Sequence, residues 1–307
     1  MRVNISVMNI LLAEYTCHHD PGLAPEGKAM VTTLRKSFER IGAEVVMPEP
    51  GVDFGDEIRR LAPDCDEALV ITPDRLLARY TKIVEDLSRN IGCNSLAIAV
   101  CANKRRTADT LKKHGIDVPA EVSSGKRVIK EISGCGAVNM RYLDEEPGET
   151  ELSQEFIEGE HLSVSLVGSR NVGEVCLYYT GEGPLILSLN RQNIRIDENG
   201  LFHYDGGETP VTHPRQDEII AIAQKASTIL GCQGYTGVDL VVSSDRIVVV
   251  DVNPRPTDSI VGISAIMEEE IADIILKASY GRSPDRVTIR GRAVFGKDGK
   301  VTVSDRD

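Results

Sequence analysis

The most informative stretch of this chain is Gly237-Val238-Asp239-Leu240 followed, one predicted hairpin later, by Val248-Val249-Val250-Asp251-Val252-Asn253-Pro254-Arg255-Pro256. Alternate positions of a strand share a face, so Asp251, Asn253 and Arg255 can point together. Asp239, on the neighbouring strand, can lie beside Asp251. Two carboxylates and an amide oxygen on one face suit Mg²⁺ held jointly with phosphates. An arginine on that face would neutralise phosphoryl oxygens.

The alternative is a polar outer strand face that ends in ordinary turn residues. The run before Asp251 is continuously apolar, however, so these acids occur where a buried strand ends. That position favours a metal site at Asp239, Asp251 and Asn253.

A second segment, Gln154-Glu155-Phe156-Ile157-Glu158-Gly159-Glu160-His161, lies between two strand-like runs. A strand–turn–strand of this kind offers backbone amide and carbonyl groups at residues 155–157 that can bind an adenine edge. Glu160 or His161 can then bond the ribose hydroxyls. Taken alone, an ordinary acidic hairpin is the simpler interpretation.

Two lysines form a third signal, Lys104 at the start of a predicted helix and Lys130 inside the strand-like run Arg127-Val128-Ile129-Lys130. A lysine in an apolar strand needs a partner, and phosphate is one. Ser133-Gly134-Cys135-Gly136 follows and can lay backbone amides against phosphate oxygens. It lacks the longer spacing of a Walker A loop, and an ordinary turn is the alternative.

The composition of the chain narrows the possible classes of protein. The net charge of −12 and the absence of Trp argue against a nucleic-acid partner. The seven cysteines are scattered without CxxC pairs, which favours free thiols and a cytoplasmic protein. The apolar stretch Ile5–Ala13 is too short for a membrane span, and residues 1–7 are interpreted either as a dispensable extension before the first strand or as the result of a wrongly assigned start.

The first hundred residues alternate strand-like runs with helical spacing. Apolar runs at 9–15, 44–47, 67–72 and 95–101 alternate with helical stretches at 26–41 and 76–90. This alternation predicts a small parallel α/β domain over residues 1–101.

The rest of the chain predicts an α+β body. A helix at 104–114 is followed by strand-like runs at 127–132, 152–157, 161–168, 173–180 and 184–190. A helix at 217–230 precedes two long strands at 237–242 and 247–252, and a helix at 264–279 precedes a C-terminal hairpin at 287–303.

In this order, the lysines, the acidic hinge and the Asp…Asp-x-Asn-x-Arg pattern resemble the ATP-grasp superfamily from about Lys104 to Asp258. The resemblance implies two α+β subdomains, 102–158 and 159–307, that clasp ATP with Mg²⁺ or Mn²⁺. It implies the following roles: phosphate binding by Lys104 and Lys130, adenine binding at Gln154, Glu155 and Ile157, ribose binding by Glu160 or His161, metal binding by Asp239, Asp251 and Asn253, and stabilisation of an acyl phosphate by Arg255, with Lys130 also catalytic. Lys130-Glu131 replaces the Lys-Pro of many relatives, and the glycine loop is short.

The opening pattern Ile10-Leu11-Leu12-Ala13-Glu14-Tyr15, then Pro25-Glu26-Gly27-Lys28-Ala29-Met30, looks like the tyramine–glutamate ligase family of methanofuran biosynthesis. Cys101-Ala102-Asn103-Lys104 and Thr257-Asp258-Ser259 are similar too. This resemblance implies L-glutamate and tyramine as substrates, an acyl-phosphate intermediate and release of ADP. By analogy with the superfamily, a homodimer is also expected.

Other functions remain as alternatives. The chain can be a ligase for a different carboxylate and amine, and Arg191 and Arg195 are candidates for additional phosphate or substrate contacts. It can also be a nucleotide-binding regulatory protein, although such a protein has no need to keep the metal acids and both lysines. An oxidoreductase built on the first domain would need GxGxxG, which His18-His19-Asp20-Pro21-Gly22 does not supply.

Overall fold

Four parallel strands form the first sheet of the computed structural model, which describes residues 7–134, 140–142, 145–169 and 183–305. The strands are β1 (Asn9–Glu14), β2 (Glu44–Val46), β3 (Glu67–Ile71) and β4 (Arg89–Asn90), in the order β2-β1-β3-β4. β1 and β3 are buried along almost their whole length, as expected for parallel strands that are covered on both faces. The predicted parallel α/β lobe is therefore confirmed.

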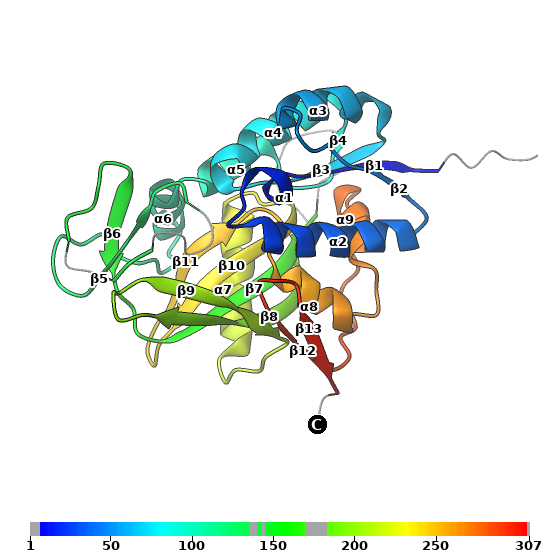
Figure 1. Cartoon of the computed structure of the whole chain (residues 1–307). Coiled ribbons are helices and arrows are strands. Elements are labelled where there is room, and N and C mark those ends of the chain that lie inside the picture. The colour runs from blue at the N-terminus through cyan, green and yellow to red at the C-terminus, as the bar shows by residue number, and fades with distance from the viewer. Residues whose placement is uncertain (1–6, 135–139, 143–144, 170–182, 306–307) are drawn as a thin grey trace, which may run out of the picture.

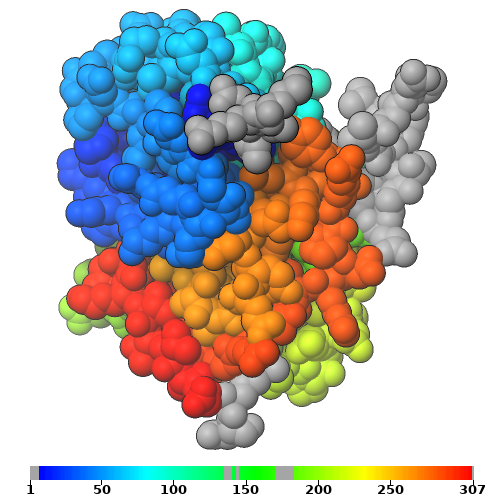
Figure 2. Space-filling model, turned by 90° about the vertical axis from the view of Figure 1, so that its right-hand side faces the viewer, coloured from blue at the N-terminus to red at the C-terminus, as the bar shows by residue number. Residues whose placement is uncertain are grey.

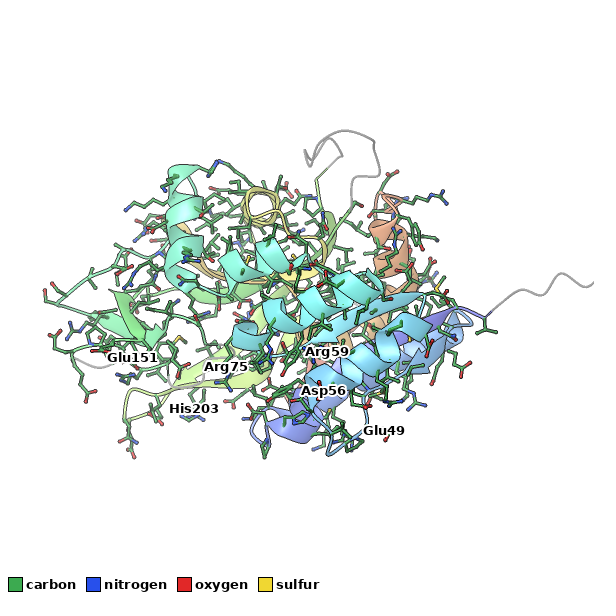
Figure 3. The ribbon with its side chains drawn as sticks, turned by 90° about the horizontal axis from the view of Figure 1, so that it is seen from above. Glu49, Asp56, Arg59, Arg75, Glu151 and His203 are labelled. Carbon is green, nitrogen blue, oxygen red and sulfur yellow. The ribbon has the colours of Figure 1, made fainter. Side chains whose placement is uncertain are left out.

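Helices cover both faces of this sheet. α2 (Ala24–Arg40) packs Met30, Leu34 and Phe38 against Ile10 and Leu12 of β1, as its helical spacing predicted. On the other face lie α3 (Phe54–Leu61), which ends in the 3-10 turn η1 (Ala62–Asp64), and α4 (Asp74–Leu87). α3 and α4, which carry Arg59 and Arg75, lie side by side (Figure 3). A short helix, α1 (Thr16–His19), joins β1 to α2.

The apolar run at 95–101 is a helix, α5 (Ser95–Cys101), and not the expected strand. Asn94 caps this helix, because its side chain accepts a hydrogen bond of 2.9 Å from the amide of Ala97. Ala97, Ile98 and Cys101 face the core. A short apolar run does not distinguish a buried strand from a buried helix, and in this segment the Asn94 cap favours the helix.

Next along the chain, α6 (Lys104–Lys113) and a two-stranded antiparallel sheet form a small unit. The sheet pairs β5 (Arg127–Glu131) with β6 (Glu151–Glu155), and lies at the left of Figure 1. The amide of Lys104 donates to the carbonyl of Ile132 at 2.9 Å, which ties the start of α6 to the end of β5.

A seven-stranded sheet forms the largest layer. Its order is β11-β10-β7-β8-β9-β12-β13, and each recorded pairing is antiparallel. The strands are β7 (Glu160–Gly168), β8 (Leu185–Ile196), β9 (Phe202–Thr209), β10 (Gly234–Val242), β11 (Ile247–Asn253), β12 (Arg292–Phe295) and β13 (Val301–Ser304). Strand β9 was not predicted, and the predicted strand at 173–180 lies outside the described residues.

Helices also lie on both faces of this sheet. α7 (Gln216–Ile229), which was predicted within one residue, packs against Leu162, Val164 and Leu240. α8 (Ser259–Ile266) and α9 (Ile271–Ser279) pack on the opposite face with Val167 and Tyr235. Figure 2 shows these helices, in orange, between the blue N-terminal lobe and the red C-terminal hairpin.

The single helix expected at 264–279 is wrong, because the chain turns between α8 and α9. Met267 is extended and pairs with Ile289 in an isolated bridge, and the amide of Glu268 donates to the carbonyl of Thr288 at 2.9 Å. These long-range hydrogen bonds interrupt a segment whose local pattern is helical.

Within the part of the chain that the structure describes, no helix is both long and apolar enough to cross a membrane. The five cysteines in that part, Cys17, Cys65, Cys93, Cys101 and Cys232, are free thiols, as predicted.

Candidate active site

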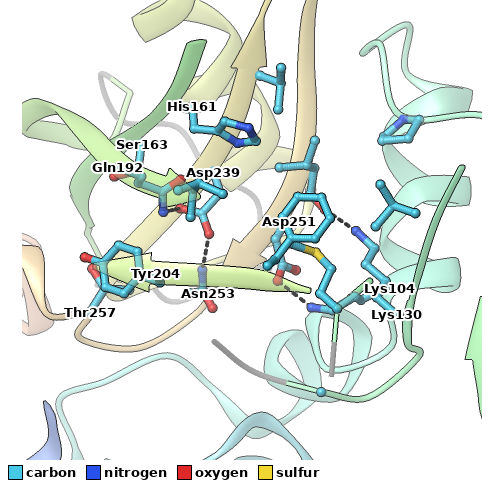
Figure 4. A pocket seen from close by; sticks show the side chains of 18 of the residues that line it. Lys104, Lys130, His161, Ser163, Gln192, Tyr204, Asp239, Asp251, Asn253 and Thr257 are labelled. Carbon is cyan, nitrogen blue, oxygen red and sulfur yellow. Dashed lines mark hydrogen bonds and ion pairs between the residues drawn. The ribbon is translucent and has the colours of Figure 1, made fainter. Parts of the chain in front are cut away.

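A β-bulge between β10 and β11 places the two predicted metal acids opposite each other. From Val242↔Ile247 to Leu240↔Val249 the pairing is regular, and a continued register would put Asp239 opposite Val250. The register instead shifts by one residue, so Asp239 pairs with Asp251 and Gly237 with Asn253. Since directly paired residues share a face, both carboxylates point into the same cavity, as Figure 4 shows.

Asp239 is half-buried and held by neutral amides. Gln192 Nε2 and Asn253 Nδ2 each donate to one of its oxygens at 3.0 Å. Burial, with the nearby charge of Asp251, raises the pKa of Asp239 to about 7. Among the described residues, the hydrogen bonds that Asp239 accepts come from neutral amides, so a bound cation would favour its charged form. Because Asn253 donates through its nitrogen, its amide oxygen remains for a metal.

The predicted lysines lie beside Asp251. Asn103 caps α6 by accepting from the amide of Arg106 at 3.0 Å, and Lys104 in the first turn forms an ion pair with Asp251. Lys130 Nζ donates to the carbonyl of Val250, the bulged residue, at 3.1 Å.

Burial and the attraction between opposite charges have opposite effects on the pKa values of Lys104 and Asp251. Burial alone would lower the pKa of Lys104, but the charges of Asp251 and Asp74 raise it. Burial would raise the pKa of Asp251, but Lys104 and Lys130 lower it. For Lys130, burial and the charge of Lys104 lower the pKa to about 8, so at pH 7 this lysine is still mostly protonated. The cluster therefore keeps two ammonium groups available for phosphate.

The predicted adenine-binding segment lines the same cavity with Gln154, Glu155, Phe156 and Ile157. The amides of Glu155 and Phe156 already donate to the carbonyls of Ala120 and Lys126, at 2.9 and 3.0 Å. The Glu155 carboxylate accepts from Arg246 at 2.9 Å, which lowers its pKa. In the described chain no hydrogen bond is recorded for the amide of Ile157, so this amide is the best placed to bind a base.

The two ribose candidates differ. His161 lines the cavity, and burial lowers its pKa, which favours the neutral ring. Glu160 instead pairs with Arg191 at 3.4 Å, and its side chain is 52% exposed. Arg191 lines the cavity, whereas Arg195 pairs with Asp205 at 3.5 Å and does not. His161 is therefore the stronger ribose candidate.

Arg255 reaches the cavity in a way that strand alternation did not predict. β11 ends at Asn253, and Arg255 lies on the loop beyond it. Its Nε donates to Asp74 Oδ1 at 3.0 Å, and the exposed fractions of these side chains are 12% and 5%. Asp74 opens α4 directly after β3, so the carboxyl edge of the parallel sheet forms part of the site.

The cavity has a volume of about 210 Å³ and includes residues to which the sequence analysis gave no role in the site: Glu26, Met30, Ser163, Gln192, Tyr204, Thr257 and Asp258. Ser163 pairs with Asp239 across β7 and β10, so strand alternation could have found it once that pairing was known. Glu26 comes from α2 of the first lobe, and no spacing rule connects it to Asp258. The phosphate loop predicted at Ser133–Gly136 falls partly outside the described residues.

A small sheet, a larger sheet and a cluster of acids and lysines between them suit an enzyme that binds a nucleotide and its phosphates. Comparison with known proteins agrees. Residues 101–259 match the model of the ATP-grasp domain. A tyramine–L-glutamate ligase from Methanocaldococcus fervens is 34% identical over 87% of this chain and 93% of that protein. Its counterpart from Methanocaldococcus jannaschii is 32% identical over 87% and 88%.

Among solved structures, a putative ATP-grasp superfamily protein from Archaeoglobus fulgidus superposes with a TM-score of 0.76 and 26% identity, covering 98% of this chain and 100% of that one. The chain therefore belongs to the ATP-grasp family, and it is an ATP-dependent acid–amine ligase.

Proposed function

We propose that this enzyme joins the γ-carboxylate of L-glutamate to the amine of tyramine. The names of its two relatives support this substrate pair. The observation that carries the chemistry is the bulged register that sets Asp239 against Asp251, with Lys104 and Lys130 beside them. Four charges around one point suit the transfer of a phosphoryl group.

The reaction has two steps. A carboxylate oxygen of glutamate attacks the γ-phosphorus of ATP, the bond from that phosphorus to the β,γ-bridging oxygen breaks, and ADP leaves. The amine nitrogen then attacks the acyl carbon, the bond from that carbon to the phosphate oxygen breaks, and phosphate leaves. The nitrogen loses its proton, and the product is an amide.

The residues of this chain position that chemistry. Lys104 and Lys130 would bind the phosphates, for which Lys104 would leave its ion pair with Asp251. Arg255, held by Asp74, would stabilise the acyl phosphate. Asp239, Asp251 and the amide oxygen of Asn253 would hold Mg²⁺ or Mn²⁺. When bound, this ion supplies positive charge for the phosphate oxygens.

At the hinge, Gln154, Glu155 and Ile157 would bind adenine, with His161 or Glu160 at the ribose. The units that close on ATP would be residues 102–158 and 159–307, behind an N-terminal domain of residues 1–101. A homodimer in the cytoplasm completes the proposal, and the molecular mass in solution tests the dimer.

The test is ADP release with ATP and Mg²⁺, measured with glutamate alone, tyramine alone and both together. Release that requires both substrates, with the amide identified by mass spectrometry, supports the proposal. If ATP binds but this pair releases no ADP, the substrate assignment is wrong, and other carboxylate and amine pairs must be tested.

A further inference from the structure

The cavity continues away from the lysines into a region with a different character. This region, the α2 end of the cavity, is lined by Glu26, Met30, Tyr204, Thr257, Asp258 and Phe295. These residues come from α2, β9, the loop after β11 and β12. Figure 4 shows Tyr204 and Thr257 on the side of Asp239 that faces away from the lysines.

Two carboxylates meet at the α2 end. Tyr204 lines this end of the cavity, and burial together with the charge of Asp258 raises the pKa of its hydroxyl. Asp258 Oδ2 is buried, and it has no hydrogen-bond partner among the described residues. The charged groups that act on Glu26 are Asp258, Arg255 and Lys297. Of these, Arg255 already pairs with Asp74.

This arrangement calls for a donor that carries positive charge. A buried carboxylate oxygen without a partner loses its solvation, and a ligand N–H group would restore a hydrogen bond. Met30 and Phe295 are 7% and 3% exposed and form apolar walls beside the acids. An organic ammonium with an apolar body matches both features, whereas a phosphate does not.

The position of Glu26 is set by close packing at the start of α2. An added Cβ at Gly27 would lie 2.0 Å from Thr16 Oγ1 and 2.4 Å from Glu14 Oε1. Glu14 in turn accepts from the amides of Thr16 and Cys17, each at 2.8 Å. The first turn of α2 is therefore held at the carboxyl edge of the parallel sheet, facing the cavity.

We propose that Glu26 and Asp258 bind the ammonium group of the amine substrate, and that Glu26 accepts its proton before attack. This inference rests on the proposed function, and it assigns a substrate-binding site to the first lobe. The N–H bond breaks as the Glu26 carboxylate takes the proton, and the nitrogen lone pair becomes free. That lone pair then forms the bond to the acyl carbon, while phosphate leaves and takes up the second proton that the nitrogen loses. Burial and the charge of Asp258, which raise the pKa of Glu26 to about 7, suit a proton acceptor near neutral pH.

Hydroxylamine separates amine binding from acyl-phosphate formation. It is small and uncharged at neutral pH, and it converts acyl phosphates into hydroxamates without an ammonium site. The full chain is assayed as wild type, Glu26→Gln and Asp258→Asn, with Glu39→Gln as a control. Glu39 lies on the same helix and pairs with Arg35 at the surface. Rates are measured with glutamate and ATP plus either tyramine or hydroxylamine, and melting temperatures verify folding.

We expect Glu26→Gln and Asp258→Asn to lower kcat/KM for tyramine by about 10- to 100-fold, the effect of losing a charged hydrogen bond. Hydroxamate formation should change less than about threefold, because acyl-phosphate formation needs neither side chain. Equal loss with both nucleophiles would overturn the inference, as would a raised KM for glutamate with an unchanged KM for tyramine. If the wild-type enzyme forms no hydroxamate from glutamate, the proposed function has failed instead.

Discussion

The two ends of the cavity differ in how their charge is balanced and in where their residues originate. At the lysine end, Lys104 forms an ion pair with Asp251, and Lys130 donates to the carbonyl of the preceding residue, Val250. At the α2 end, Glu26 and Asp258 line the cavity with like charge, and the nearby Arg255 is paired with Asp74. The lysine end thus suits a phosphate chain, and the α2 end suits a cation. An enzyme that joins an activated acid to an amine needs both.

The largest effect is expected from Asp251→Asn at the lysine end. This change removes the charge that Lys104 and Lys130 share and one predicted metal ligand, while the side-chain volume stays almost the same. We expect ADP release to fall by about 10³-fold or more. Asp245→Asn, in the exposed turn between β10 and β11, is the control and should retain activity. Substantial activity in Asp251→Asn would show that the two acids do not form the reaction centre.

A smaller effect is expected where the two ends meet. Asp74→Asn removes the charge that pairs with Arg255, so the guanidinium loses its fixed position. We expect kcat to fall by about 10- to 100-fold while the KM for ATP changes little. Asp86→Asn, at an exposed position on the same helix, is the control. If kcat is unchanged, the catalytic position of the Arg255 guanidinium does not depend on Asp74 of the first lobe.

Gly27→Ala tests whether the α2 end depends on packing in the first lobe. Its added methyl group would lie 2.0 Å from Thr16 Oγ1, so α2 or the buried side chains of Thr16 and Glu14 must shift. We expect about 1–3 kcal/mol of destabilisation, seen as a lower Tm, and a raised KM for the amine with the ATP affinity unchanged. Lys36→Ala, at an exposed site on α2, should have little effect. A loss of ATP affinity equal to the loss of amine affinity would contradict this separation.

The smallest effect concerns stability and pH. Glu26 has its pKa raised from 4.5 to about 7 in the folded protein. A raised pKa favours folding while the group is protonated, and this contribution is lost as the pH rises from about 4.5 through about 7. Glu26→Gln removes the charged form altogether. Its Tm should therefore match the wild type near pH 4 and exceed it by a few degrees at pH 8, since each kcal/mol corresponds to about 2–4 °C. A Tm difference independent of pH would refute this account.

Several errors in the sequence interpretation share one cause. The helix at 95–101 depends on the Asn94 cap, and the break between α8 and α9 depends on the bridge between Met267 and Ile289. The first segment is apolar throughout, and the second has Glu268, Glu269 and Glu270 between two apolar runs. Hydrophobic spacing alone does not separate the possible structures of either segment. By contrast, α2, α6 and α7 have clear amphipathic spacing, and their bounds were predicted closely.

For the site, the order of residues along the chain was enough to propose the lysine end. Asp239, Asp251 and Asn253 lie on the adjacent strands β10 and β11, where local periodicity predicts the direction of each side chain. Lys130 lies on β5, in the small sheet, and Lys104 lies at the start of α6. Even there, the bulge that aligns Asp239 with Asp251 is not visible in the sequence. A regular register would have turned one of the two carboxylates to the other face.

The α2 end could not be read from the chain in the same way. Glu26 and Asp258 are separated by more than two hundred positions, and they meet because α2 and the loop after β11 pack together in three dimensions. Local residue patterns determine strands, helices and the side chains that alternate along them, since these depend on neighbours within a few residues. The contact between lobes depends on burial and hydrogen bonds summed over distant segments, and therefore only the folded structure reveals it.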